Sequence, residues 1–156
     1  MNSLPTYKLT SIEEDVVAEI RALRTSPGSG PLAALLESPA RLAHHFILAS
    51  HGNVQLRFRT LAGELGVERR TLERTFAAEF QKTMMQFQVE VRLAFSQYLL
   101  SAFPPTKISA IAAILGYDLV RDFNRFFKQH MNRSPSEWSR RERERIAHEA
   151  KRTSLD

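Results

Sequence analysis

Cysteine is absent from this chain of 156 residues. This absence excludes disulfides, thiolate zinc sites, iron–sulfur clusters and a cysteine nucleophile. Long apolar runs are missing as well. The first thirty residues lack the apolar core of a signal peptide, and no stretch approaches the roughly 20 apolar residues of a membrane span. We therefore expect a cytoplasmic protein without a membrane partner.

What the chain has instead is an excess of positive charge. Its 22 Lys and Arg residues oppose 17 Asp and Glu residues, for a net charge of +5 at pH 7. Residues 52–140 contain thirteen basic and eight acidic residues, so they account for this excess. A chain of this length forms one or two small units. The charge bias predicts a polyanionic partner, and charge by itself does not choose between nucleic acid and a membrane surface.

The pattern of apolar residues predicts helices throughout. No stretch alternates polar and apolar residues long enough to indicate a strand. One helix should begin after Ser11 and end before Pro27, and a second should run from near Pro39 to Ser50. Residues 26–31 have the composition of a linker, since no strand precedes them as it would a phosphate-binding loop. The fold class is therefore expected to be all-α.

An internal repeat is the strongest signal in the sequence. Residues 61–87 match residues 111–138, with an offset of 50 up to the pair Gly66 and Gly116 and of 51 beyond it. Each copy has a short helix, a glycine that can adopt a positive φ, a tight connection and a second helix. These are the parts of a helix-turn-helix. The change of offset predicts a connection one residue longer in the second copy.

The second helix of each copy should have an apolar face and a basic face. In the first copy, Arg70 and Arg74 lie about 160° and 200° around the helix from Leu72, which begins the apolar face. Arg121 and Arg125 occupy the same angles in the second copy. Two such arginines at the start of a helix suit bidentate donation to guanine O6 and N7 in the major groove. An ordinary solvated helix face would account for this arginine pattern in one copy, but it accounts less well for the same pattern in both copies.

The segment between the copies predicts one long helix over residues 85–101. Its seventeen residues would span about 25 Å, enough to hold two small units at a fixed separation. Its apolar side is expected to comprise Phe87, Val91, Ala94, Phe95, Tyr98 and Leu99.

This arrangement resembles the DNA-binding unit of the AraC/XylS class of bacterial transcription regulators, in which a long helix joins two helix-turn-helix modules. The resemblance is strongest in the second copy, at Leu115-Gly116-Tyr117 and from Ser134 to Trp138. It implies an N-terminal helical extension at 1–46 with its linker at 26–31, a DNA-binding domain at 47–140 and a charged tail at 141–156. Within that domain the modules would occupy about 58–83 and 108–134, with the linker helix at about 85–101.

The resemblance also implies which side chains read bases. They are Arg69, Arg70, Glu73 and Arg74 in the first module and Val120, Arg121, Asn124 and Arg125 in the second. Lys128 shares the outward angles of the second module. We expect no catalytic residue, no metal and no cofactor.

The sequence departs from the family pattern at two helix ends. The family usually has Gly where Gln81 and Asn132 stand. Asn tolerates a left-handed conformation but Gln does so poorly, so we expect the first recognition helix to end differently from the second. Glu73 and Asp122 also bring carboxylates near the phosphates, although Glu73 is able to accept from a cytosine N4 amine.

Three histidines suggest a metal site at His44, His45 and His51, with His44 and His51 on one helix face. Because they have no carboxylate or thiolate partner, a partly exposed helix face is favoured instead.

Residues 140–145 alternate in the sign of their charge, which is typical of a solvated helix. Contact of this stretch with the DNA backbone is the alternative.

The sequence thus predicts a non-enzymatic, sequence-specific transcription regulator that binds double-stranded DNA. Its two recognition helices would enter successive major-groove segments, as a monomer on an asymmetric site. One alternative is a helical protein-interaction module that binds an acidic partner such as RNA polymerase, and another is an accessory domain of a truncated enzyme. The chain is expected to be either a stand-alone regulator or the C-terminal piece of a longer one.

Overall fold

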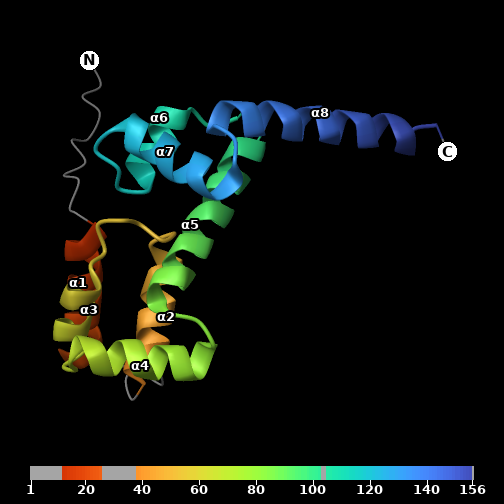
Figure 1. Ribbon diagram of the computed structural model, residues 1–156. Coiled ribbons are helices and arrows are strands. Elements are labelled where there is room, and N and C mark those ends of the chain that lie inside the picture. The colour runs from red at the N-terminus through yellow and green to blue at the C-terminus, as the bar shows by residue number, and fades with distance from the viewer. Residues whose placement is uncertain (1–11, 26–37, 103–104, 156) are drawn as a thin grey trace. The chain divides into compact units, whose positions relative to one another are not determined.

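The computed structural model describes residues 12–25, 38–102 and 105–155 (Figure 1). Within these ranges every regular element is an α-helix, which confirms the all-α class. The helices are α1 (Ile12–Thr25), α2 (Pro39–Ala49), α3 (Phe58–Glu64), α4 (Arg69–Phe80), α5 (Met84–Ser101), α6 (Ile108–Ile114), α7 (Val120–Met131) and α8 (Pro135–Thr153).

The chain divides into two compact units. The first comprises Met1–Ser50 and Gln55–Phe87, and the second comprises His51–Val54 and Gln88–Asp156. Each unit contains one predicted helix-turn-helix, α3–α4 in the first and α6–α7 in the second. The division falls within α5, so this single helix belongs to both units, as a linker helix should.

Local sequence explains where several helices begin and end. Pro stands at the start of α2 and α8, and the Ser before it accepts a hydrogen bond from a first-turn amide, Ser38 in one case and Ser134 in the other. The predicted end of the first helix before Pro27 and the predicted span of the second are confirmed by α1 and α2. Ser11 and the linker at 26–31 lie outside the described residues.

The two modules repeat the same core. Leu72 in α4 and Phe123 in α7, which the sequence repeat pairs, are both completely buried, and so are the next members of each apolar face, Phe76 and Phe127. Four residues connect α3 to α4 and five connect α6 to α7, as the change of offset predicts. The internal repeat is therefore a repeat of tertiary structure.

Both turns and both helix ends are left-handed. Gly66 and Gly116 have φ of 72° and 87°, as predicted. The expectation that the first recognition helix ends differently was wrong, because Gln81 (φ 59°) and Asn132 (φ 58°) adopt the same conformation. The side-chain Nε2 of Gln81 donates to the carbonyl of Ala78 at 2.8 Å, which helps to hold this strained position.

The buried stripe of α5 differs from the predicted apolar side. Of the residues expected on that side, Phe95 and Leu99 pack against the core of the second unit, whereas Tyr98 is 70% exposed and Ala94 is exposed too. The stripe that packs inward repeats every four residues and contains polar side chains. Its members are Met84, Gln88, Arg92, Ser96 and Leu100.

The reason is that α5 packs against a short non-helical segment, residues 51–54, whose carbonyls need donors. Gln88 Nε2 donates to the Asn53 carbonyl at 2.9 Å, and Arg92 Nε donates to the Gly52 carbonyl at 2.8 Å. A Cβ at Gly52 would stand only 2.4 Å from the backbone oxygen of Gln88. Polar side chains therefore face inward along α5, and the segment approaches them closely only because of its glycine.

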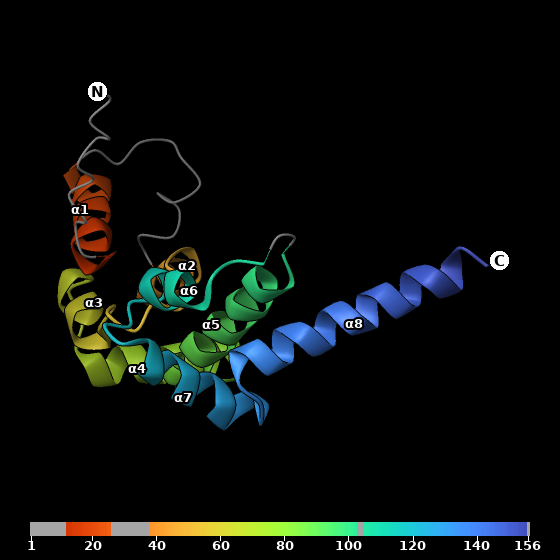
Figure 2. The same ribbon diagram turned by 90° about the horizontal axis from the view of Figure 1, so that it is seen from above.

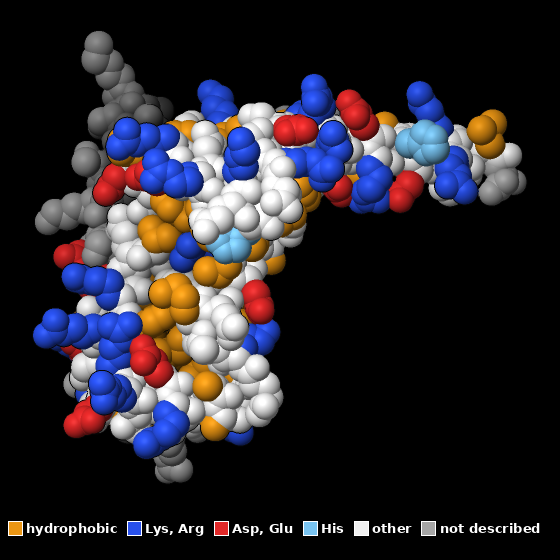
Figure 3. All heavy atoms as spheres, in the orientation of Figure 1, with side chains coloured by type: hydrophobic (Ala, Val, Ile, Leu, Met, Phe, Trp, Pro, Cys, Tyr) orange, Lys and Arg blue, Asp and Glu red, His pale blue; other side chains and the backbone are white. Residues whose placement is uncertain are grey.

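The last helix, α8, matches the predicted solvated helix. Its C-terminal half extends away from the other helices of the second unit (Figures 1 and 2). Basic and acidic side chains alternate along it (Figure 3), and Arg145 bonds both Glu142 and Glu149. No helix in the described ranges has the length and apolarity to cross a bilayer.

Candidate nucleic-acid interface

The outward face of α4 contains three arginines in two different states. Arg70 and Arg74 are exposed, and their side chains form no hydrogen bond or ion pair within the described part of the chain. Arg69 Nε, by contrast, donates to Glu73 Oε1 at 2.8 Å, one helical turn away. This helix therefore presents two unpaired guanidinium groups beside one fixed ion pair.

The outward face of α7 has the same two arginine positions. Arg121 and Arg125 are exposed, as is Lys128 one turn further on. Arg121 Nε lies 3.8 Å from Asp122 Oδ1, a long contact between exposed groups that contributes little. The side chains of Arg125 and Lys128 have no partner among the described residues. Their positive charges are available to a polyanion.

The two modules differ at two positions, four residues apart, at the start of each recognition helix. Where the first module has the ion pair of Arg69 and Glu73, the second has Val120 and Asn124. Asn124 Oδ1 is buried and has no hydrogen-bond partner among the described residues. A buried acceptor without a partner lowers the stability of the fold. The predicted site residues thus lie together within each helix but form chemically distinct surfaces.

Neither recognition helix has a side-chain cap. The N-cap residues Glu68 and Leu119 make no capping hydrogen bond, whereas Ser38 and Ser134 cap the helices outside the two modules. Uncapped amides at the start of a helix attract negative charge and are among the groups that contact DNA phosphates. Both recognition helices therefore begin, close to their arginines, without a side-chain cap.

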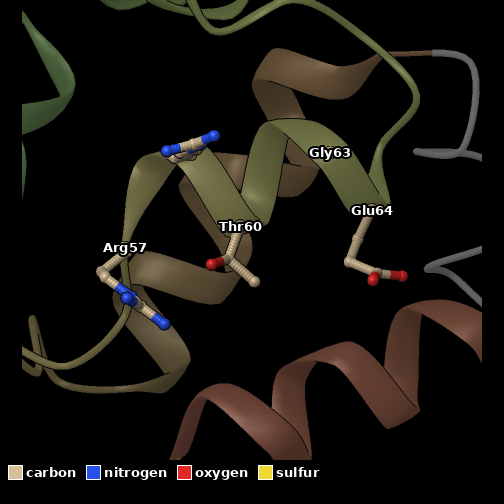
Figure 4. A pocket seen from close by; sticks show the side chains of 5 residues that line it. Arg57, Thr60, Gly63 and Glu64 are labelled. Atoms are coloured by element: carbon tan, nitrogen blue, oxygen red, sulfur yellow. The ribbon is translucent and has the colours of Figure 1, made fainter.

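A shallow hollow of about 390 Å³ lies beside α3 (Figure 4). Arg57, Arg59, Thr60, Gly63 and Glu64 line it.

Helix α1 supplies partners for the charges in this hollow. Glu13 accepts from the backbone N–H of Arg57 at 3.0 Å and from its Nη2 at 2.8 Å, and also from the Thr60 hydroxyl. Arg21 Nη2 donates to Glu64 at 3.0 Å. The hydrogen bond from Arg57 is the main cause that lowers the pKa of Glu13. The hollow is a seam between packed helices, and sequence reasoning missed this contact.

The histidines do not form a shared helix face, so that expectation was wrong. Helix α2 ends at Ala49, and His51 has a positive φ of 57° beyond it. His51 stacks on Phe95, while His44 stacks between Phe80 and Phe87 with ring centroids 4.4 and 4.3 Å away. Within the described ranges, no three metal-ligating side chains of His, Cys, Asp or Glu come together.

Two helix-turn-helix modules, each with exposed arginines on its second helix, define the class of double helix-turn-helix DNA-binding domains. The family model of a helix-turn-helix domain matches residues 61–141, just over half of the chain. The chain belongs to this family in its AraC/XylS form, and it is a DNA-binding transcription regulator.

Solved structures support the assignment. The C-terminal domain of AraT, a response regulator from Geobacillus stearothermophilus, is 25% identical with a TM-score of 0.60, over 66% of this chain and 84% of that one. A probable AraC family transcriptional regulator from Rhodopseudomonas palustris is 25% identical with a TM-score of 0.52, over 67% and 96%.

The DNA-binding domain of AdpA, solved in complex with a target DNA, has the same fold. It is 21% identical to this chain with a TM-score of 0.60, and the match covers 69% of this chain and 95% of that one. A search of the curated proteins finds no match.

Proposed function

We propose that this protein recognises a specific sequence of double-stranded DNA by inserting α4 and α7 into successive major-groove segments. The observation that carries the proposal is the repetition of two exposed arginines, four residues apart, at the start of both helices. Arg70 and Arg74 correspond to Arg121 and Arg125. The AdpA domain bound to its target DNA supports the same use of the fold.

The side chains divide into three roles. The four corresponding arginines read guanine, because a guanidinium donates two parallel hydrogen bonds to O6 and N7. Glu73 holds Arg69 in place and accepts from a cytosine amine, while Val120 and Asn124 contact bases in the second segment. Lys128 neutralises a phosphate and positions the helix.

The domain limits and the assembly follow from the same proposal. We place the helical extension at 1–46, the DNA-binding domain at 47–140 and the charged tail at 141–156. Because two unlike modules share one α5, a single chain supplies both recognition helices, so the site is asymmetric and a monomer occupies it. The protein acts in the bacterial cytoplasm without enzymatic activity, and RNA polymerase is its candidate protein partner.

Selection of bound duplexes from a random DNA pool, followed by footprinting, tests the proposal. Arg74→Ala and Arg125→Ala should each weaken binding by about 1–3 kcal/mol and relax specificity at different base pairs. Arg152→Ala removes the same charge from the end of α8 and should leave the base preference unchanged.

Salt provides a second, independent measurement. With about six to ten phosphate contacts, affinity should fall by about 10³ to 10⁵ between 50 and 200 mM salt. A flat salt response, or two substitutions that relax the same base pair, would contradict the proposed use of both helices. Absence of any defined footprint would favour a protein-interaction module instead.

A further inference from the structure

The recognition helix of the second module begins with two adjacent exposed apolar side chains. Leu119, its N-cap residue, is 47% exposed, and Val120, its first helical residue, is 39% exposed. The corresponding residues of the first module are Glu68 and Arg69, which are charged. The two modules therefore present opposite chemistry at equivalent places.

The fold does not require apolar residues at these two positions. Glu68 and Leu119 both have extended backbones (φ −67°, ψ 143° and φ −123°, ψ 131°), and neither helix has a side-chain cap. The first module packs the same core with charged residues there. Single exposed apolar residues are ordinary, but an adjacent pair that replaces two charges needs another reason.

The outward face of α7 beside this pair indicates a negatively charged partner with apolar groups. Asp118 precedes the pair and Arg121 follows it, 3.8 Å from Asp122, but Arg125 and Lys128 further along the face are exposed and have no acidic partner among the described residues. Asn124, one turn after Val120, has a buried oxygen without a partner among the described residues, where the first module has an ion pair. At these two positions α7 therefore lacks the ion pair that α4 forms.

We propose that Leu119 and Val120 contact the 5-methyl groups of thymines, so that α7 selects thymine in its half of the site while α4 does not. The inference rests on the proposed function. Among the four bases only thymine presents a methyl group in the major groove, and apolar side chains read it by direct contact. Arg121 and Arg125 then read guanines close to those thymines, while Lys128 meets a phosphate.

A protein surface is the other conceivable occupant. A protein partner would have to place acidic groups opposite Arg125 and Lys128 and an apolar patch opposite Leu119 and Val120, because burial of an unpaired charge is costly. On DNA the same cations meet phosphates and bases. The charge around the pair thus favours the major groove.

Deoxyuridine provides the direct test, because it differs from thymidine only by the methyl group. Duplexes that the full chain selects from a random pool serve as probes, and each thymine is replaced in turn. In the segment whose readout depends on Arg125, one or two replacements should weaken binding by about 4-fold each, the effect of burying one methyl. Replacements in the segment that depends on Arg74 should change affinity less than 2-fold.

A variant that transplants the residues of the first module provides the matched control. Leu119→Glu combined with Val120→Arg should abolish the discrimination between thymine and uracil. Helix content measured by circular dichroism should stay unchanged, since the first module folds with the same residues. The comparison of thymine with uracil uses the wild-type protein, so its result would stand even if the double variant misfolded.

Three outcomes would overturn the inference. Tight, specific binding with equal affinity for thymine and uracil throughout the site would overturn it and leave the proposed function standing. If the double variant still discriminated thymine from uracil but no longer bound RNA polymerase, Leu119 and Val120 would form a protein contact instead. Failure of the wild-type protein to select any sequence would overturn both the inference and the proposed function.

Discussion

Replacement of Arg92 by Met tests whether the polar inward stripe of α5 stabilises the second unit. Arg92 is buried, with Nε bonded to the Gly52 carbonyl and Nη1 to the Tyr117 hydroxyl at 3.2 Å. Its guanidinium carbon lies 4.6 Å from the centroid of the Phe126 ring. Met keeps most of the volume and removes every polar contact.

The expected loss is about 3–5 kcal/mol of unfolding free energy. The largest part is the buried Gly52 carbonyl, which is left without its charged donor. Loss of the bond to Tyr117 and of the cation–π contact with Phe126 adds about 1–3 kcal/mol. Burial lowers the pKa of Arg92, so relief from its desolvation offsets part of this loss.

The single tryptophan makes the measurement selective. Trp138 belongs to the second unit and packs edge-on against Phe127 at 6.0 Å, so its fluorescence follows unfolding of this unit. With an m-value of about 2 kcal/mol/M, the urea midpoint should fall by about 2 M. Tyr98→Ala, on the outward side of the same helix, should cost less than about 0.5 kcal/mol. If Arg92→Met unfolded no more easily than Tyr98→Ala, the assignment of α5 faces would be wrong.

The remaining predictions concern the first unit. Glu13→Gln should loosen the docking of α1, with its amides exchanging about 2- to 5-fold faster by hydrogen exchange, since Arg57 is exposed and its ion pair is screened. Because the folded-state pKa of Glu13 is lowered, wild-type α1 should also loosen as pH falls below about 4.5. The Gln variant should show no such step. An identical acid response in both proteins would contradict this contact. The pKa of His44 is lowered, mainly because its ring is buried between aromatic rings. The unfolded chain therefore binds the proton more readily, and stability of this unit should be full above about pH 6.5 and decline below it. NMR titration of the ring measures the pKa directly, and His44→Phe should remove the decline in hydrogen-exchange stability of α4; a pKa at or above 6.5 would refute the reasoning.

Comparison of the chain with itself made most of the fold predictable. Matching residues 61–87 with 111–138 located both modules, both glycine turns and the longer second connection, because each of these depends on local geometry. The outward position of Arg74 and Arg125 followed from helical periodicity alone. The ion pair of Arg69 and Glu73 was not predicted, although residues four apart on a helix are neighbours.

Features that depend on distant partners were not predictable. Periodicity assigns the apolar side of a helix to the core, but the inward side of α5 is chosen by the carbonyls of residues 51–54, about 40 positions earlier. The pairing of Glu13 with Arg57 joins residues 44 positions apart. The acidic first turn of α1 was visible in the sequence, but its partner was not. Leu119 was within reach, since the repeat pairs it with a charged residue.

The two modules differ where they meet solvent and agree where they pack. Leu72 and Phe123 are apolar and completely buried, because a close-packed core tolerates little change in shape. On the surface no such constraint applies, so an ion pair that begins with Arg69 in one module is replaced by the exposed Val120 in the other. Two identical surfaces would read the same bases in both segments of a DNA site. Two different surfaces can read different bases in each segment, and this is what the proposed binding of one chain to an asymmetric site requires.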